Sequence, residues 1–211
     1  MTLEHEIDKL HEKFVKLVEK RPRTPSETEQ METLMAILET LLNRQSQLLL
    51  DELANVGIRI KSVWDLVNSS GSYPEAIPIL VRYLREPYFN RTKEGIVRAL
   101  AVKEAKGLAN KVVMEEYLKL PKESHEEPWI FHYRWAFGNT MRIIVTKNDL
   151  EELIEIVLDE TNGDSRNMFV RALAKLKSPK VRETLEVLVN DNSPTVSDEA
   201  RKALSRKRPA N

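Results

Sequence analysis

A short pattern of residue types recurs along this chain at intervals that limit the folds open to it. Four alanines, each followed by a leucine or a phenylalanine, are separated by 37, 36 and 31 positions. These residues are Ala99, Ala136, Ala172 and Ala203. Periods of roughly 30–47 residues are typical of stacked helix–turn–helix units. The pattern therefore predicts an all-α protein built from repeated helical pairs.

An apolar segment of helical length precedes each of these alanines. The four segments are 74–85, 108–120, 149–160 and 179–190. Ser178-Pro179 is a typical helix start, because proline fits the first helical position. Asn148, with Glu151 three residues later, has the spacing of a capping box. Pro78 lies inside the first segment, where we expect it to kink the helix.

Residues 1–55 are predicted to form an N-terminal helical hairpin. Apolar residues recur at helical spacing on both sides of 21–25, where two prolines end the first helix. Ser26, with Glu29 three residues later, has the spacing of a capping box for the second helix. The stripe of leucines and methionines on this second helix is either ordinary core or a self-association face.

Composition excludes several kinds of chemistry. The chain has no cysteine, which removes disulfides, thiolate metal sites and a cysteine nucleophile. His5 and His11 are six positions apart, so one helix cannot direct both at a single metal. We find no glycine-rich phosphate loop and no converging carboxylates, and we therefore expect no catalytic residue, no cofactor and no metal. No apolar run approaches the ~18 residues of a membrane span, which favours a cytoplasmic protein.

The repeated region resembles the HEAT-repeat superfamily. The shared features are paired helices, a proline in a first helix, an aspartate in the turn within a pair, and a basic residue early in the second helix before the alanine. The residues that carry them are Pro78, Asp164, Asp191, Lys93 and Arg166. Residues 49–106 also resemble an uncharacterised family of bacterial HEAT-repeat proteins. Two copies depart from the pattern, because Ile130 and Ser197 stand where the basic residue is expected, and this predicts an incomplete polar ladder between repeats.

The resemblance implies a right-handed α-solenoid of HEAT-like helical pairs that follows the N-terminal hairpin. About four repeats are expected over 74–207, and they divide into 74–106, 107–147, 148–177 and 178–207. Residues 56–73 are expected to form a connecting helix and turn, or a degenerate repeat. Residues 208–211 are expected to be a tail.

One pair of residues breaks the pattern of the repeats. In three copies, a polar residue stands five positions before the alanine and a basic residue stands one position before it. Such pairs are typical of an exposed helix face. These pairs are Glu94 with Arg98, Asn167 with Arg171, and Asp198 with Lys202. The central copy instead has Phe131 and Trp135. Either another part of the chain covers these rings, such as the N-terminal hairpin or the loop 121–128, or a partner does.

The sequence favours a non-catalytic module that binds a protein or peptide on the concave face of the solenoid, as a scaffold, an adaptor or an inhibitor. Aromatic residues beside arginines are typical of the residues that dominate protein interfaces. Phe131 and Trp135 are the expected apolar anchors. Arg98, Arg171 and Arg142 are expected to pair with carboxylates of the partner.

Two alternatives remain open at this point. Tryptophans near arginines are similar to those of HEAT-like enzymes that excise alkylated DNA bases. However, 33 basic and 33 acidic residues give zero net charge, so nucleic-acid binding is not expected. Duplex DNA binding that weakens steeply with salt would favour this alternative. The second alternative is a structural protein that self-associates through the N-terminal helices.

Overall fold

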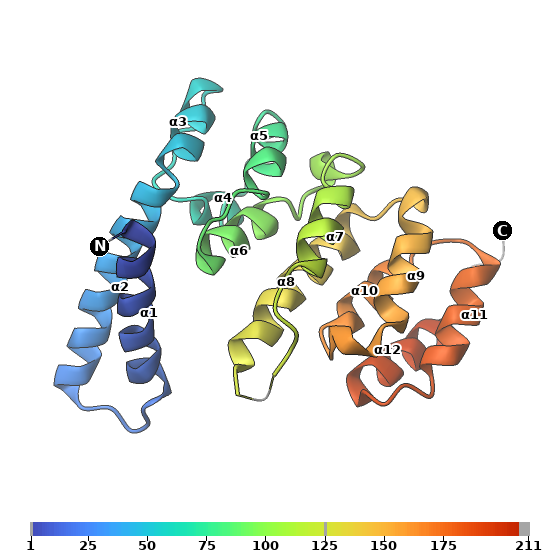
Figure 1. Cartoon of the computed structure of the whole chain (residues 1–211). Coiled ribbons are helices and arrows are strands. Elements are labelled where there is room, and N and C mark those ends of the chain that lie inside the picture. The colour runs from blue at the N-terminus through green and yellow to red at the C-terminus, as the bar shows by residue number, and fades with distance from the viewer. Residues whose placement is uncertain (1, 125, 207–211) are drawn as a thin grey trace.

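The chain is all-helical in the residues described by the computed structural model, which are 2–124 and 126–206 (Figure 1). No β-strand occurs within these ranges, and the all-α prediction is confirmed. The expected tail, 208–211, lies outside them. The helices are α1 (Leu3–Glu19), α2 (Pro25–Gln45), α3 (Gln47–Asn55), α4 (Trp64–Val67), α5 (Ala76–Tyr83), α6 (Asn90–Ala99), α7 (Asn110–Leu118), α8 (Pro128–Ile144), α9 (Leu150–Leu158), α10 (Arg166–Leu173), α11 (Pro179–Leu188) and α12 (Pro194–Ser205). Three short 3₁₀ helices are η1 (Lys103–Ala105), η2 (Lys147–Asp149) and η3 (Glu160–Asn162).

Helices from α5 onward pack in sequential pairs, and the second helices of the pairs also pack on one another. The pairs in contact are α5 with α6, α7 with α8, α9 with α10, and α11 with α12. Helix α8 contacts both α6 and α10, and α10 contacts α12, so α6, α8, α10 and α12 form one row. One continuous apolar core extends from α3 to α12. The repeated alanines Ala99, Ala136 and Ala172 are fully buried in it, because a small side chain lets neighbouring helices approach closely.

Two of the expected helix starts shift by a few residues. Thr24, rather than Ser26, caps α2, and its hydroxyl and the Glu27 carboxylate form the reciprocal bonds of a capping box. The shift places Pro25 at the first helical position, where its missing N–H has no acceptor to lose. A capping box also precedes α9, formed by Thr146 and Asp149 in η2 rather than by Asn148.

Pro78 does not occupy the position expected of a kinking proline. Helix α5 begins at Ala76, so Pro78 is its third residue. The N–H groups of the first helical turn have no acceptor within the helix. The proline therefore removes no hydrogen bond from the body of α5, and the physical reason for expecting a kink there is absent.

A polar ladder joins each helical pair to the next. A basic side chain on the second helix of one pair reaches the following pair in three places. The links are Lys93 to Glu116, Arg134 to Asn162 and Arg166 to Asp191, with N–O distances of 2.8, 3.0 and 2.9 Å. The gap predicted at Ile130 is therefore filled by Arg134, one helical turn further along α8. Arg134 is fully buried, and its guanidinium lies 4.1 Å from the centre of the Tyr117 ring.

Two of these arginines, and Arg201 of α12, also donate to carbonyl groups at the end of the preceding helix. Arg134 donates to the Leu120 carbonyl, Arg166 to the Val157 carbonyl, and Arg201 to the Val189 carbonyl. Cations are favoured at helix C-termini, where carbonyl groups lack partners. In α8 and α12 the basic residue stands one turn later than in α6 and α10.

The N-terminal helices α1 and α2 are attached to the rest by a small separate contact. Their core consists of Ile7, Leu38 and Leu42, with Phe89 from the start of α6 packed against it. The His11 ring lies 4.9 Å from the Phe89 ring, edge to face. No described helix is both long and apolar enough to cross a membrane.

Acidification is expected to weaken this attachment. Burial lowers the pKa of His11; Asp8 opposes the shift, Arg91 adds to it and Glu12 opposes it. As the pH falls below about 6.5, His11 therefore becomes protonated in the unfolded chain before it does so in the folded protein. The contribution of His11 to stability is present above that pH and is lost below it.

Thermal unfolding between pH about 7.5 and about 5 would measure this effect. The wild type should lose more stability on acidification than His11→Gln. His5 is exposed on the same helix, so His5→Gln should behave as the wild type. An equal pH dependence in the His11 variant and the wild type would contradict the assignment.

Candidate functional site

Helix α8 presents three of the predicted site residues on one face. Phe131, Trp135 and Arg142 are separated by four and seven positions, which brings them within about 20° of one line along a helix. The other faces of α8 bury Tyr133, Phe137 and other apolar residues in the core. Since α8 is held between α6 and α10, this stripe has a fixed place on the row of second helices.

The two anomalous rings are half-buried. Phe131 and Trp135 are both intermediate in exposure, and the neighbouring Trp129 is 37% exposed. Phe131 borders a hollow together with Glu123, Ser124 and Pro128, so these three residues of the loop lie beside that ring. The loop therefore does not cover the rings completely, because both remain partly accessible.

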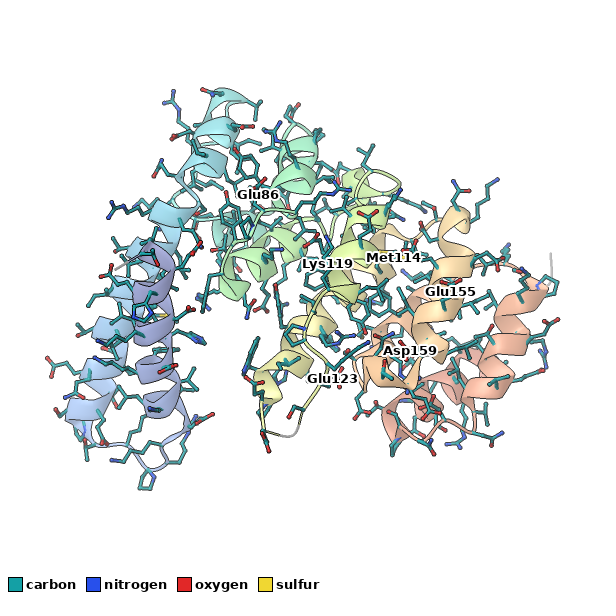
Figure 2. The ribbon with its side chains drawn as sticks, in the orientation of Figure 1. Glu86, Met114, Lys119, Glu123, Glu155 and Asp159 are labelled. Atoms are coloured by element: carbon teal, nitrogen blue, oxygen red, sulfur yellow. The ribbon has the colours of Figure 1, made fainter. Side chains whose placement is uncertain are left out.

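The hollow next to Phe131 has a volume of about 540 Å³. It lies between the start of α8 and the start of α10, and its remaining lining residues are His132, Gly163 and Asp164. The Glu123 carboxylate accepts the backbone N–H groups of Asp164 and Ser165 at 2.7 and 2.9 Å. Figure 2 labels Glu123 between α8 and α10. A side chain at Gly163, which has φ +74°, would collide with this carboxylate. The loop is thus fixed to the N-terminus of α10, where an anion is favoured.

Two of the three predicted arginines are already paired within the chain. Arg98 forms an ion pair with Glu94, four residues before it, at 2.7 Å. Arg171 pairs at 2.8 Å with Glu199 of α12, whose side chain is only 5% exposed, and not with Asn167. Because their charges are compensated, neither arginine is available to a partner's carboxylate without losing an internal bond.

Arg142 is different, because it forms no ion pair with any described residue. Its Nε atom is buried and has no acceptor. Lys175, just after α10, donates to the Arg142 carbonyl. Burial lowers the pKa of Lys175, and the nearby charges of Arg142 and Lys106 lower it further. Lys106, Arg142 and Lys175 therefore form a cationic cluster beyond the C-terminal end of the aromatic stripe.

Sequence reasoning missed two members of this cluster and the partner of Arg171. Lys106 and Lys175 lie outside the repeated pattern, in segments that follow η1 and α10. Glu199 is the residue four before Ala203, and its equivalents in the other copies are Gly95, His132 and Met168. No residue type is shared at that position, so the pattern held no signal for an acidic partner there.

The site thus consists of a hollow at the start of α8, two half-exposed rings along it, and uncompensated positive charge at its end.

In comparisons with known proteins, no family model matches the chain, and no curated protein or solved structure gives a significant match.

Proposed function

We propose that this chain is a non-catalytic protein-binding module with a right-handed, HEAT-like α-solenoid architecture. In this proposal α6, α8, α10 and α12 line its concave face, and the stripe on α8 binds a protein or peptide segment. Second helices form the inner surface of such solenoids, where extended partners bind. The module would serve as a scaffold, an adaptor or an inhibitor of its partner.

The proposal rests on one observation. Helix α8 carries two partly accessible rings at positions where another second helix carries an ion pair. At the positions of Phe131 and Trp135, α6 has the ion pair of Glu94 and Arg98. Half-exposed phenylalanine and tryptophan side chains lose contact with water when a partner covers them, and such residues supply most of the free energy of many interfaces.

The charges along the stripe specify the partner further. With a rise of about 1.5 Å per residue, Arg142 lies about 10 Å from Trp135 and about 16 Å from Phe131 along α8. A matching segment would insert an apolar side chain beside the rings and place a carboxylate at the cationic cluster of Lys106, Arg142 and Lys175. Arginine pairs well with carboxylates because its planar group donates two parallel hydrogen bonds.

Combined replacement of the two rings should abolish capture of the partner. The partner is first isolated from the native host with the wild-type chain, and its affinity is then measured for each variant. Phe131→Ala with Trp135→Ala is expected to weaken binding at least about 100-fold, since each anchor of this kind contributes ~2 kcal/mol or more. Arg142→Gln should weaken it less, with an effect that diminishes at high salt.

Two controls separate recognition from stability. Leu158→Ala with Val187→Ala removes two exposed apolar side chains from the first helices α9 and α11, and binding should be unchanged. Arg98→Gln tests an arginine that is already paired with Glu94, and it should also bind normally. If the ring variant keeps the wild-type circular dichroism and still retains every captured protein, the proposed site is wrong.

A further inference from the structure

The hollow beside Phe131 carries negative charge. Its lining includes the carboxylates of Glu123 and Asp164 and no lysine or arginine. With His132 counted as neutral, these two carboxylates give the lining a formal charge of −2. The cationic cluster described above lies near the opposite end of α8. The two ends of the aromatic stripe therefore have opposite charge.

Glu123 has a structural role at the start of α10. Its side chain is only 15% exposed, and its carboxylate lies 3.9 Å from the buried guanidinium of Arg134. The same carboxylate accepts the backbone N–H groups of Asp164 and Ser165. Glu123 therefore supplies the negative charge that a helix N-terminus favours, and its own charge is compensated within the chain.

Asp164 has no such role. It is exposed, it lines the hollow, and it forms no ion pair with any described residue. The polar ladder does not use it either, because Arg134 donates to the Asn162 side chain in this turn. A second carboxylate beside Glu123 adds like-charge repulsion, which a cation at Asp164 would relieve. The charge of Asp164 is therefore available to a partner.

The other walls of the hollow suit the stem of a long basic side chain. Phe131 contributes a half-buried aromatic ring and Pro128 an apolar ring. Cations are attracted to the faces of aromatic rings, and lysine and arginine pack their methylene stems on apolar surface while the charged group stays in a polar environment. A metal ion fits less well, because the described residues contain no group of three or more side chains that could hold one.

We propose that the hollow binds a lysine or arginine side chain of the partner segment, with its stem against Phe131 and Pro128 and its charged group at Asp164. Glu123 stays bound to the start of α10 in this complex, so the loop does not have to rearrange. The inference rests on the proposed function, because the same segment has to cover the rings on α8.

The opposite charges at the two ends of α8 define the composition of the partner segment. One end of the segment carries the basic residue for the hollow, and the other carries the carboxylate for the cationic cluster, with an apolar side chain between them. Phe131 and Arg142 are about 16 Å apart along α8, and an extended chain advances about 3.3 Å per residue. The basic and acidic residues should therefore be about five positions apart in an extended segment. A segment with the same charge at both positions is repelled at one end.

Selection of displayed random peptides on the full wild-type chain tests this arrangement of charges. The selected peptides are expected to contain lysine or arginine about five positions from aspartate or glutamate. The affinity of one such synthetic peptide is then measured for the wild type and for two variants. Asp164→Lys should weaken binding at least about tenfold through like-charge repulsion, and Asp164→Asn should weaken it less. Both effects should diminish at high salt.

A charge exchange tests the contact between the basic residue of the peptide and Asp164. A peptide with glutamate in place of its basic residue should bind Asp164→Lys more tightly than it binds the wild type, because the double exchange restores the attraction. Glu183→Lys is the matched control. Glu183 is exposed on α11, so this variant makes the same change in net charge away from the hollow and should leave the affinity unchanged.

Two kinds of result would overturn the inference, and they can be distinguished. If the selected peptides depend on Phe131 and Trp135 but lack a basic residue, or bind Asp164→Lys as tightly as the wild type, the hollow does not bind a cation and the proposed function still stands. If no selected peptide depends on Phe131 and Trp135, the proposed function itself is wrong and the inference is wrong with it.

Discussion

Replacing Arg166 by methionine is expected to lower the free energy of unfolding by about 3–5 kcal/mol, the usual cost of removing one partner from a buried ion pair. Both nitrogen ends of the Arg166 guanidinium bind Asp191, each at 2.9 Å. The side chains of Arg166 and Asp191 are only 2% and 4% exposed. Methionine fills a similar space but leaves the Asp191 carboxylate buried and without its cation.

The loss of stability should exceed that expected from the ion pair alone, because Arg166 also donates to two backbone carbonyls. Its Nε binds the Gly163 carbonyl and its Nη1 binds the Val157 carbonyl, both at 2.8 Å. The bond to the Val157 carbonyl is buried, and a buried carbonyl that loses its donor adds a desolvation cost of ~1–3 kcal/mol. The bond to the Gly163 carbonyl is only partly buried and should add less. Urea unfolding followed by circular dichroism measures the total as a lower midpoint at similar slope.

Two further variants identify the cause of the loss. Arg166→Met combined with Asp191→Leu should be more stable than the sum of the single losses predicts, because no unpaired charge is left, with a coupling of ~0.5–3 kcal/mol. Arg182→Met breaks an ion pair with Glu186 on the surface of α11, where both side chains are more than half exposed, and should cost under about 1 kcal/mol. If the Arg166 and Arg182 variants were equally stable, the polar ladder would contribute little to the free energy of unfolding.

The recurrence of alanine made the helical pairs predictable, because it reflects a local physical need. A small side chain is required where two helices cross closely, and Ala99, Ala136 and Ala172 are all fully buried at such crossings. Helix starts were less predictable. Thr24 and Ser26 are both good caps, and only the fit of Pro25 at the first helical position decides between them.

The polar ladder shows the limit of position-by-position comparison. The sequence led us to expect a gap at Ile130, because in two copies the basic residue stands six positions before the alanine. Arg134 stands two positions before it and reaches the Asn162 side chain from there. One helical turn moves a long side chain by only ~5 Å along the same face, so arginine can make the link from either position.

The candidate site was predictable where it depends on the register within one helix, and not where it depends on contacts between helices. Phe131 and Trp135 were identified from their equivalents in the other copies. The pairing of Arg171 with Glu199 and the approach of Lys175 to Arg142 join different helical pairs. Such contacts depend on the rotation and spacing of successive pairs, which the residue pattern of a single repeat does not specify.

The second large effect is expected at Gly138, where α8 crosses α10. A Cβ atom at this position would lie 2.7 Å from the Met168 Cβ and 2.9 Å from the Phe169 ring. The Met168 Cβ is attached directly to the α10 backbone, so it cannot move away by changing a rotamer. Gly138→Ala must therefore push the two helices apart, which typically costs about 1–3 kcal/mol and should exceed the ~1 kcal/mol that alanine gains in a helix.

Gly95 and Gly71 provide graded comparisons for Gly138→Ala in urea unfolding. A Cβ at Gly95 would lie 2.6 Å from the γ-methyl of Val63, a buried and stiff β-branched side chain, so Gly95→Ala should also lose stability. Gly71 is exposed and its added Cβ would make only ordinary contact, so Gly71→Ala should change the stability little.

Because α8 carries the aromatic rings and Arg142 while Lys175 follows α10, separating these helices should also pull the cationic cluster apart. Gly138→Ala is therefore expected to weaken partner binding even where the protein remains folded, and full binding at reduced stability would show that the site tolerates a shift between α8 and α10.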